Sequence, residues 1–266
     1  MLSEASPPSD PDLSSALAVL EALRRRAPEQ PLLGMDGHTV TRGDFAARVA
    51  ECSGALVRQG IGPGDHVGMV LPNSIAWCVF FWAAVNVGAV PVPLDPQTGA
   101  WEVRNLTSLL PIKLWVIVPR FRAADIAGAI ASAYPEKRPT VVNVEGDGEG
   151  LTSMSASVAG APSLPIPFHD PQGDDALNVA CTSGTTGNPK LIVLPHRGFV
   201  KAQRDMAGVL ELSSNDRVLL GMPLYHQGGF GMGLQSLLSG ATTHYRLAFE
   251  PNSFLETIER ERITVV

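Results

Sequence analysis

The chain has 266 residues, of which 45% are hydrophobic and 17% are charged, and its formal net charge is −6. This composition predicts a globular chain with a sizeable core, in one large domain or two subdomains, and it is too mixed for a membrane protein. The acidic balance, without any stripe of lysine and arginine, disfavours a nucleic-acid partner.

The amino-terminal residues differ in composition from the rest of the chain. They are rich in serine, proline and aspartate, and they lack the basic-then-apolar order of a signal peptide. We therefore expect a disordered tail over residues 1–12 and a cytoplasmic protein. Cys52, Cys78 and Cys181 lie in apolar segments without metal-ligand spacing, so we expect reduced core thiols and no metal site built on them.

Helices and strands are predicted to alternate along the first part of the chain. Leucines at helical spacing predict a helix from Leu13 to Leu23, and the turn Asp36-Gly37 predicts a hairpin. Thr41 resembles the start of a capping box for a helix that ends at Gly60. Further strands are expected at Val67–Leu71, Val90–Val92, Leu114–Val118 and Thr140–Val144, and further helices from Ser74 to Gly88, at Glu102–Leu110 and at Ala123–Ala133.

The longest apolar stretch runs from Ile75 to Val92. Asn86, Gly88 and Pro91 interrupt it, so it predicts a buried helix followed by a strand rather than a membrane span.

A change of composition divides the chain. Residues 145–174 are rich in Gly, Ser, Ala and Pro without apolar periodicity, which indicates a connector and a boundary near residue 170. We expect a first α/β portion over 13–170, in which the alternation of strands and helices predicts a largely parallel sheet covered on both faces, and a second α/β portion over 171–266. The second portion is predicted from strands at Leu177–Thr182, Leu191–Leu194 and Val218–Met222, a helix carrying Phe199, Met206 and Leu210, and the segments Phe230–Leu238, Thr242–Tyr245 and Phe254–Arg260.

The last residues, Ile263-Thr264-Val265-Val266, are apolar and β-branched, with no turn signal after them. They predict the beginning of a buried strand, which is an unusual place for a natural terminus.

A segment dense in hydroxyls and glycines follows the strand predicted at Leu177–Thr182. It reads Thr182-Ser183-Gly184-Thr185-Thr186-Gly187-Asn188-Pro189-Lys190. Glycines let backbone N–H groups turn toward an anion, hydroxyls donate further hydrogen bonds, and the lysine adds a full positive charge. We therefore expect this segment to bind a triphosphate.

The phosphate loop of Walker-type NTPases, Gly-x-x-x-x-Gly-Lys-Ser/Thr, fits this segment poorly. With Gly184 and Lys190 aligned to its first glycine and its lysine, Pro189 replaces the second glycine and Leu191 replaces the magnesium-binding hydroxyl. A Walker-type NTPase is therefore disfavoured, whereas anion binding is not. A surface linker is the alternative, because Ser, Thr and Gly are common in loops, but a linker seldom joins two buried strands.

The same nine residues resemble the signature of the adenylate-forming superfamily, which comprises acyl-CoA synthetases, luciferases and peptide-synthetase adenylation domains. In that family the loop wraps the pyrophosphate end of ATP, and the resemblance implies this role for each residue from Thr182 to Lys190. It also implies the fold: two sheet-and-helix α/β subdomains of a large amino-terminal domain, here incomplete at the carboxy-terminal end. The chain departs from the family pattern at Leu191, where glycine is usual.

Two earlier segments are similar to landmarks of that family. They are Gly62-Pro63-Gly64-Asp65-His66-Val67 with Leu71-Pro72-Asn73-Ser74, and Gly88-Ala89-Val90-Pro91-Val92-Pro93-Leu94-Asp95-Pro96. Because glycines and prolines at strand ends set turns without doing chemistry, both are expected to be scaffold.

A third segment helps to identify the molecule that receives the acyl group. It reads Met222-Pro223-Leu224-Tyr225-His226-Gln227-Gly228-Gly229. In CoA-ligating members a Pro-Leu-aromatic-His segment lies beside the acyl pocket, so the resemblance implies that His226 contacts the acid. A structural hydrogen-bonding histidine is the alternative. Adenylation domains usually carry Phe-Asp at this place, and fatty acyl-AMP ligases usually depart from Thr-Gly-x-Pro-Lys, so a CoA ligase is favoured over both. His196 matches a further family position and is expected to lie in a loop or at the start of a helix.

The resemblance implies two half-reactions, with ATP, Mg²⁺ and CoA as cofactors and Lys190 and His226 as catalytic residues. A carboxylic acid, aryl or fatty, forms an acyl-adenylate and pyrophosphate, and the CoA thiol then displaces AMP. Positioning and charge stabilisation dominate such chemistry.

Other parts that the family uses are not found in the sequence. These are an aromatic-Gly-x-Thr-Glu segment, an Asp for ribose and a lysine on a carboxy-terminal domain. We therefore expect a truncated polypeptide or proteolytic fragment that is inactive alone. The alternatives are a noncatalytic nucleotide-binding module, an adenylation enzyme that delivers to a carrier protein, and an unrelated phosphate-binding α/β protein.

Overall fold

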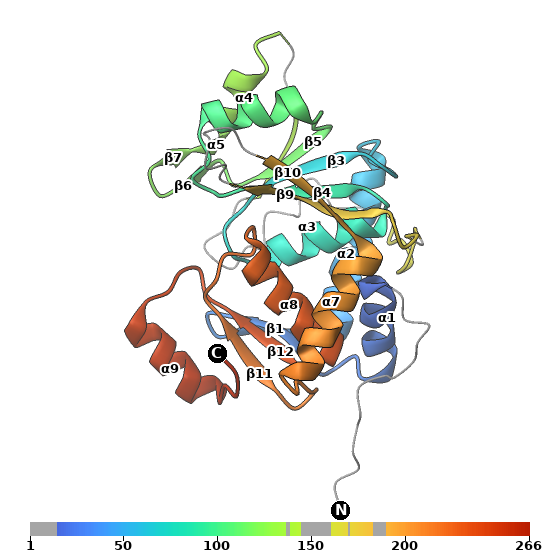
Figure 1. The fold of residues 1–266 in the computed structure, drawn as a ribbon, viewed down its shortest axis with the longest axis vertical. Coiled ribbons are helices and arrows are strands. Elements are labelled where there is room, and N and C mark those ends of the chain that lie inside the picture. Colours follow the sequence, from blue (N-terminus) through green and yellow to red (C-terminus); the bar gives the residue numbers. More distant parts are fainter. Residues whose placement is uncertain (1–14, 137–138, 145–160, 170, 183–189) are drawn as a thin grey trace, which may run out of the picture.

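The computed structural model describes residues 15–136, 139–144, 161–169, 171–182 and 190–266. Two four-stranded sheets and two two-stranded hairpins are packed with helices between and around them (Figure 1). The predicted tail over residues 1–12 lies outside the described residues. The α/β class predicted from the alternating pattern is confirmed.

The sheet we call sheet I joins strands from both ends of the chain. Its order is β11 (Arg217–Leu220), β12 (Thr242–Tyr245), β1 (Pro31–Met35) and β2 (His38–Thr41). The β1–β2 pair is antiparallel and turns at Asp36 and Gly37, whose φ angles of 49° and 86° fit the predicted hairpin. The other two pairs are parallel.

The sheet we call sheet II is entirely parallel. Its order is β4 (Val90–Pro93), β3 (His66–Val70), β5 (Leu114–Ile117) and β8 (Thr140–Asn143). Alternate side chains point to opposite faces of a strand; Val116 packs with the cluster around α3 (Ile75–Asn86), whereas Trp115 packs with α4 (Ala100–Leu109) and α5 (Ile126–Ala133). Both faces are covered, as predicted.

Helix α3 is buried over all twelve of its residues. A helix that is apolar all round belongs in a core, and this one lies between the two sheets (Figure 1). Ser74 caps it by accepting a hydrogen bond from the N–H of Trp77 at 3.1 Å, and Gly88 follows it with a φ of 76°. The prediction of a buried helix followed by a strand at Ile75–Val92 is confirmed. Within the described residues, no helix has the length and apolarity that crossing a membrane requires.

The remaining helices complete the core. Helices α1 (Ala16–Arg26), α2 (Arg42–Arg58) and α8 (Gln227–Ser239) pack with α3 in one cluster. Helix α7 (His196–Val209) adds Val200 to that cluster, and α9 (Pro251–Glu261) lies along sheet I. Phe230 of α8 contacts Phe81 and Phe199, with ring centroids 4.5 and 5.6 Å apart. His196 starts a helix, as predicted.

Three predicted segments differ from the structure. The helix predicted from Ala123 begins at Ile126, because Arg122 has a φ of 53° and a small hairpin of β6 (Arg120–Phe121) and β7 (Ala124–Asp125) comes first. The strand predicted to end at Met222 ends at Leu220. The strand expected at Leu191–Leu194 is present as part of β10 (Lys190–Pro195), but it is exposed rather than buried.

The last residues begin to pair with sheet I, as predicted for the start of a strand, but they are not buried. Val265 makes one parallel bridge to Val218, its carbonyl accepts from the N–H of Leu219 at 2.9 Å, and Val266 is 70% exposed. The hydroxyl of Thr264 donates to the carboxylate of Asp216 at 2.8 Å and accepts from the N–H of Arg217 at 3.0 Å, so this residue also caps the start of β11.

The predicted boundary near residue 170 stays a prediction. Sheet I takes two strands from residues before this boundary and two from residues after it. The described part of the connector, 161–169 and 171–175, contains no helix or strand.

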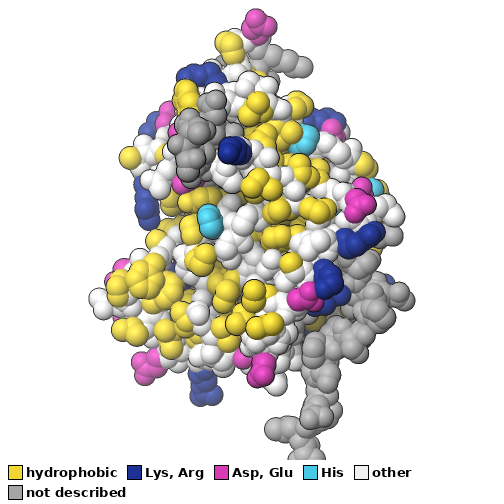
Figure 2. Space-filling model, viewed as in Figure 1, with side chains coloured by type: hydrophobic (Ala, Val, Ile, Leu, Met, Phe, Trp, Pro, Cys, Tyr) yellow, Lys and Arg dark blue, Asp and Glu magenta, His cyan; other side chains and the backbone are white. Residues whose placement is uncertain are grey.

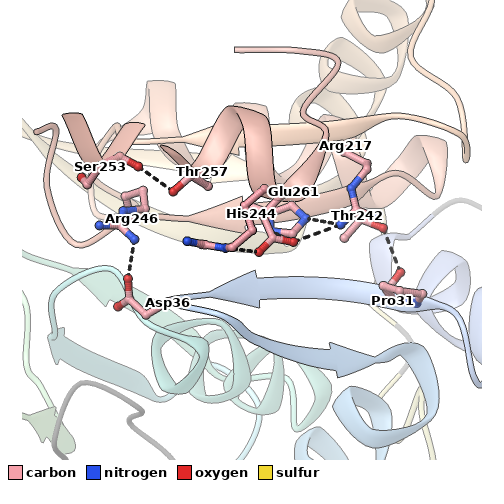
Figure 3. Close-up of polar contacts among 10 residues, drawn as sticks. Pro31, Asp36, Arg217, Thr242, His244, Arg246, Ser253, Thr257 and Glu261 are labelled. Carbon is pink, nitrogen blue, oxygen red and sulfur yellow. Dashed lines mark hydrogen bonds and ion pairs between the residues drawn. The ribbon is translucent and has the colours of Figure 1, made fainter. Parts of the chain in front are cut away.

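A polar network ties sheet I to helix α9 (Figure 3). The Nη2 group of Arg217 lies 3.2 Å from Nε2 of His244 and 3.3 Å from a carboxylate oxygen of Glu261. The ring of His244 is buried and packs on Gly34, where a Cβ atom would lie 2.5 Å from its Nδ1. Burial and the neighbouring Arg217 lower the pKa of His244 to about 4. Arg246 pairs with Asp36 at 2.6 Å.

We predict that the protein loses stability between pH 6.5 and about 4.5. Burial lowers the pKa of both His196 and His244 to about 4, so the unfolded chain binds protons that the folded chain excludes. Stability is then complete above pH 6.5 and falls by roughly 2 kcal/mol for each ring as the pH drops toward 4.

Urea unfolding across this range measures the effect. His244→Gln should flatten the slope. A free energy of unfolding that stays constant from pH 7 to pH 4.5 would contradict the prediction.

Candidate functional site

The ends of the hydroxyl-rich loop are held by a regular hairpin. Thr182 ends β9 (Ala176–Thr182) and Lys190 begins β10; the two residues pair in register. The Thr182 hydroxyl makes a long contact of 3.5 Å to the Lys190 carbonyl. The residues between them, Ser183, Gly184, Thr185, Thr186, Gly187, Asn188 and Pro189, lie outside the described residues. The structure therefore brings the two ends of the predicted phosphate site together.

The hairpin fits its surroundings without a glycine after Lys190. Leu191 pairs with Cys181 in the antiparallel ladder and packs with it against the core cluster of sheet II. The hairpin lies beside β4. The Lys190 side chain is exposed, so its ammonium group is available to an anion at the loop.

Strand β10 and the neighbouring helix α7 expose apolar side chains. Ile192 and Val193, which are consecutive and therefore point to opposite faces of the strand, are 46% and 59% exposed, and Met206 and Val209 on α7 are 48% and 77% exposed. Figure 2 shows hydrophobic side chains gathered across the middle of the face on which Figure 1 places the hairpin. Within the described residues, neither face of β10 is fully covered.

The segment Met222–Gly229 makes a tight turn from sheet I into helix α8. A Cβ atom on Gly229 would lie 2.2 Å from the carbonyl oxygen of Pro223, so only glycine lets the first turn of the helix pack on the preceding backbone. His226 is the N-cap residue of α8, and its Nδ1 accepts a hydrogen bond from the N–H of Gly228 at 3.1 Å.

This bond defines the chemistry that the imidazole of His226 offers. Since Nδ1 is an acceptor, the neutral ring carries its proton on Nε2. The side chain is exposed, so Nε2–H is free to donate to an oxygen atom of a ligand. His226 and the two loop ends come from different elements, the start of α8 and the hairpin.

Asn73 holds the Met222–Gly229 segment in place. Its amide nitrogen donates to the carbonyls of Met222 and Arg246, each at 3.0 Å, and its amide oxygen accepts from the N–H of Leu224 at 2.7 Å. The side chain is 5% exposed. Because the Met222 carbonyl is bound by the Asn73 amide, it is not available to a neighbouring strand, and strand β11 ends before Met222.

Tyr225 and Asp95 form a second link across the same region. The Tyr225 hydroxyl donates to a carboxylate oxygen of Asp95 at 3.0 Å, and burial together with this carboxylate raises the pKa of Tyr225 to about 12. Both residues line a cavity of about 210 Å³ with Asn73, Gln97, Arg122 and Phe249. Tyr225 therefore remains a protonated donor in the wall of this cavity.

Asn73 and Asp95 were expected only as scaffold. Neither residue is marked by spacing, because the carbonyls and the hydroxyl that they bind lie more than 100 residues later in the chain. A polar Asn73 directly before an apolar helix was the one available signal. His226 was expected beside an acyl pocket, but Tyr225 rather than His226 lines the cavity described above.

The cysteines are free thiols, and the described residues contain no group of side chains suited to a metal ion. Cys52 and Cys78 are buried free thiols, as predicted, and burial raises the pKa of Cys78 to about 12. Cys181 is only half-buried. In the part of the chain that the structure describes, no three His, Cys, Asp or Glu side chains are grouped so as to hold a metal ion.

Comparison with known proteins gives one family and many relatives. The profile of the family described as "AMP-binding enzyme" matches residues 20–266. The chain is 30% identical over 259 residues to 3-[(3aS,4S,7aS)-7a-methyl-1,5-dioxo-octahydro-1H-inden-4-yl]propanoyl:CoA ligase of Mycobacterium tuberculosis, covering 96% of this chain and 51% of the ligase. It is 29% identical over 248 residues to the long-chain-fatty-acid–CoA ligase FadD13 of the same species, covering 91% and 48%.

A solved structure shares the fold. The inhibitor-bound N-terminal domain of FACL13 from Mycobacterium tuberculosis superimposes with a TM-score of 0.82 at 24% identity, covering 94% of this chain and 61% of that one. The chain spans about half the length of the two ligases that it matches.

We predict opposite effects for two buried asparagines. Asn73→Leu leaves two carbonyls and one N–H without partners and should destabilise the fold by roughly 2–4 kcal/mol. Asn178 in β9 is fully buried, and neither its amide oxygen nor its amide nitrogen has a partner among the described residues. Asn178→Leu should therefore stabilise by roughly 1–2 kcal/mol.

Chemical unfolding of both variants beside the original chain tests this pair. The two substitutions are chemically identical, so each is the control for the other. Equal losses of stability at both positions would refute the interpretation of their hydrogen bonding.

Proposed function

Because the chain belongs to the AMP-binding enzyme family, which it matches over residues 20–266, we propose that it forms part of an ATP-dependent acid–CoA ligase. The observation that carries the proposal is the loop from Thr182 to Lys190, whose ends are paired by the β9–β10 hairpin. A short hairpin fixes the separation of the loop ends and places the exposed Lys190 at one of them. The residue types between the two ends are hydroxyl and N–H donors of the kind that bind a phosphate.

In the proposed first half-reaction, a carboxylate oxygen of the acid attacks the α-phosphorus of ATP. The new C–O–P linkage forms as the bond from the α-phosphorus to the bridging oxygen breaks, and pyrophosphate leaves with the electron pair. Negative charge develops on the phosphate oxygens, and we assign Lys190 and the donors of Thr182 to Pro189 to these oxygens as part of the proposal.

In the proposed second half-reaction, the CoA thiol loses its proton to solvent and the thiolate attacks the acyl carbon. The C–S bond forms as the bond from the acyl carbon to the AMP oxygen breaks, and AMP leaves with the electron pair. His226 is suited to this side of the site because its Nε2–H is free to donate to a carboxyl or carbonyl oxygen, while Nδ1 is held by Gly228. Tyr225 contributes a protonated hydroxyl to the wall of the cavity that it lines with Asp95.

Mg²⁺ would neutralise charge on the phosphates, but no metal ligand is assigned here, because the described residues form no group suited to one. The two half-reactions above are therefore described with residues of this chain alone and not with the metal ion. A carrier protein stays the alternative acceptor, and a cytoplasmic location stays a prediction.

The acid is proposed only as a class. The two related ligases named above act on different acids, an octahydroindenyl propanoyl group and long-chain fatty acids. The Tyr225–His226 pair favours CoA as the acceptor over a carrier protein.

We predict that the 266-residue chain alone gives no acid-dependent exchange of pyrophosphate into ATP. The expected adenine, ribose and late-lysine residues are not in its sequence. The polypeptide encoded by the full reading frame should catalyse this exchange and form CoA thioesters with a panel of aryl and fatty acids. Lys190→Ala in that polypeptide should lower kcat/KM for ATP by about 100-fold.

Absence of exchange in the full polypeptide, together with calorimetric binding of ATP, would favour the noncatalytic nucleotide-binding module. Loss of both binding and exchange would refute the proposal.

We predict that two substitutions separate the structural and chemical roles of His226. His226→Asn keeps an N-cap side chain on α8, so its stability should stay within about 0.5 kcal/mol, whereas His226→Ala should lose about 1 kcal/mol. If the imidazole contacts the acid, both variants of the full polypeptide should lose at least about tenfold in kcat/KM for thioester formation. Full activity in His226→Asn would show that the residue serves only as a cap.

A further inference from the structure

A small cavity opens at the end of sheet I that lies away from the Met222–Gly229 segment. Strand β11 begins at this cavity with Arg217 and ends near that segment with Leu220. The cavity has a volume of about 210 Å³. Its charged lining residues are Arg42, Asp216 and Arg217, and its polar ones include Gln30, Asn215 and Thr242.

Arg42 is a buried cation without a carboxylate partner in the described part of the chain. Its side chain lies at the start of α2 and is only 4% exposed. Nη2 donates to the carbonyl of Gly240 at 2.7 Å, and Nε is buried with no partner there. Burial lowers the pKa of Arg42. A buried guanidinium without an opposite charge is strongly unfavourable, and one carbonyl at the end of α8 offsets only part of this cost.

Arg217 brings a second incompletely bonded guanidinium to the same cavity. Its Nη2 contacts His244 and Glu261, as Figure 3 shows. Its Nε is buried and has no partner among the described residues. Two arginines from different elements therefore line one cavity, each with an unpaired Nε–H.

The acidic group in the cavity is already engaged. One oxygen of Asp216 accepts from the N–H and the hydroxyl of Ser213 at 2.8 and 2.9 Å, and the other accepts from Thr264 at 2.8 Å. Arg217 is paired with Glu261, so Arg42 is the cation of the lining that has no carboxylate partner among the described residues.

The first-turn amides of α2 are also engaged. The N–H groups of Arg42, Gly43 and Asp44 donate to Gln30, Pro28 and Thr41. The available donors of the cavity are therefore the guanidinium groups rather than the end of the helix.

We propose that this cavity binds a phosphate group, either as inorganic phosphate or carried on a nucleotide, with Arg42 and Arg217 as donors. The oxygens of a tetrahedral oxyanion point in several directions, which suits donors that approach from α2 and from β11. Arginine forks match such oxygens better than lysine does. The inference is independent of the proposed function, since it uses none of the residues placed in the catalytic site.

Titration with sodium phosphate, against sodium chloride at equal ionic strength, tests the proposal on the 266-residue chain. Side-chain ¹⁵N NMR should show saturable shifts of the Arg42 and Arg217 Nε–H signals. At ten times the dissociation constant, phosphate should raise Tm by about 2–4 °C. A parallel titration with AMP distinguishes the sources: shifts at lower AMP than phosphate concentrations indicate a nucleotide phosphate, and shifts with phosphate alone indicate the free anion.

Asn215→Asp provides the variant test, because Asn215 is exposed and lines the cavity. The added negative charge should weaken phosphate affinity by about fivefold, whereas Asn252→Asp, with the same charge change on α9, should leave it unchanged. Arg42→Gln, once shown to be folded by circular dichroism, should lose the saturable shift. Unchanged Nε–H signals in phosphate and in AMP, or equal affinity in Asn215→Asp and the original chain, would overturn the proposal.

Discussion

Burial of helix α3 is the constraint on which the rest of the structure depends. All twelve residues from Ile75 to Asn86 are buried, so the helix must be covered on every side. Sheet II covers one side, and sheet I with α2 and α8 covers the others. The stacked rings of Trp77 and Phe81, with centroids 5.0 Å apart, reach Phe230 of α8. Neither sheet could form its core face without this shared helix.

The two ends of α3 position the segments that make up the candidate site. Asn73 lies just before the helix and binds the backbone that leads to His226, so the position of His226 follows from that of α3. Gly88 follows the helix and leads into β4, beside which the β9–β10 hairpin lies. The β9–β10 hairpin and the Met222–Gly229 segment are thus placed by opposite ends of one helix, although they are far from it in the sequence.

Local patterns in the sequence predicted what depends on local physics. The Asp36-Gly37 turn, the Ser74 cap and the parallel strands of sheet II all follow from neighbouring residues, and all are present. The phosphate-binding role of the loop from Thr182 to Lys190 stays a prediction from its residue types, because only its two ends are described. Asn73 and the Tyr225–Asp95 pair were not recognisable from the sequence, since their partners are distant in sequence. The exposure of β10 was missed for a related reason: an apolar strand indicates burial only when some other element covers it.

Sheet I also bears on the order in which the chain can fold during synthesis. The Pro31 carbonyl accepts from the hydroxyl of Thr242, 211 residues later, and β12 is the parallel neighbour of β1. The β1–β2 hairpin therefore emerges from the ribosome long before its partner strand, with one edge unpaired and its apolar face uncovered. Closing the long loop between β1 and β12 is slow. An unpaired strand edge can meanwhile pair with other chains. We therefore expect the growing polypeptide to need protection, by a chaperone or by slow elongation, until residue 245 has emerged.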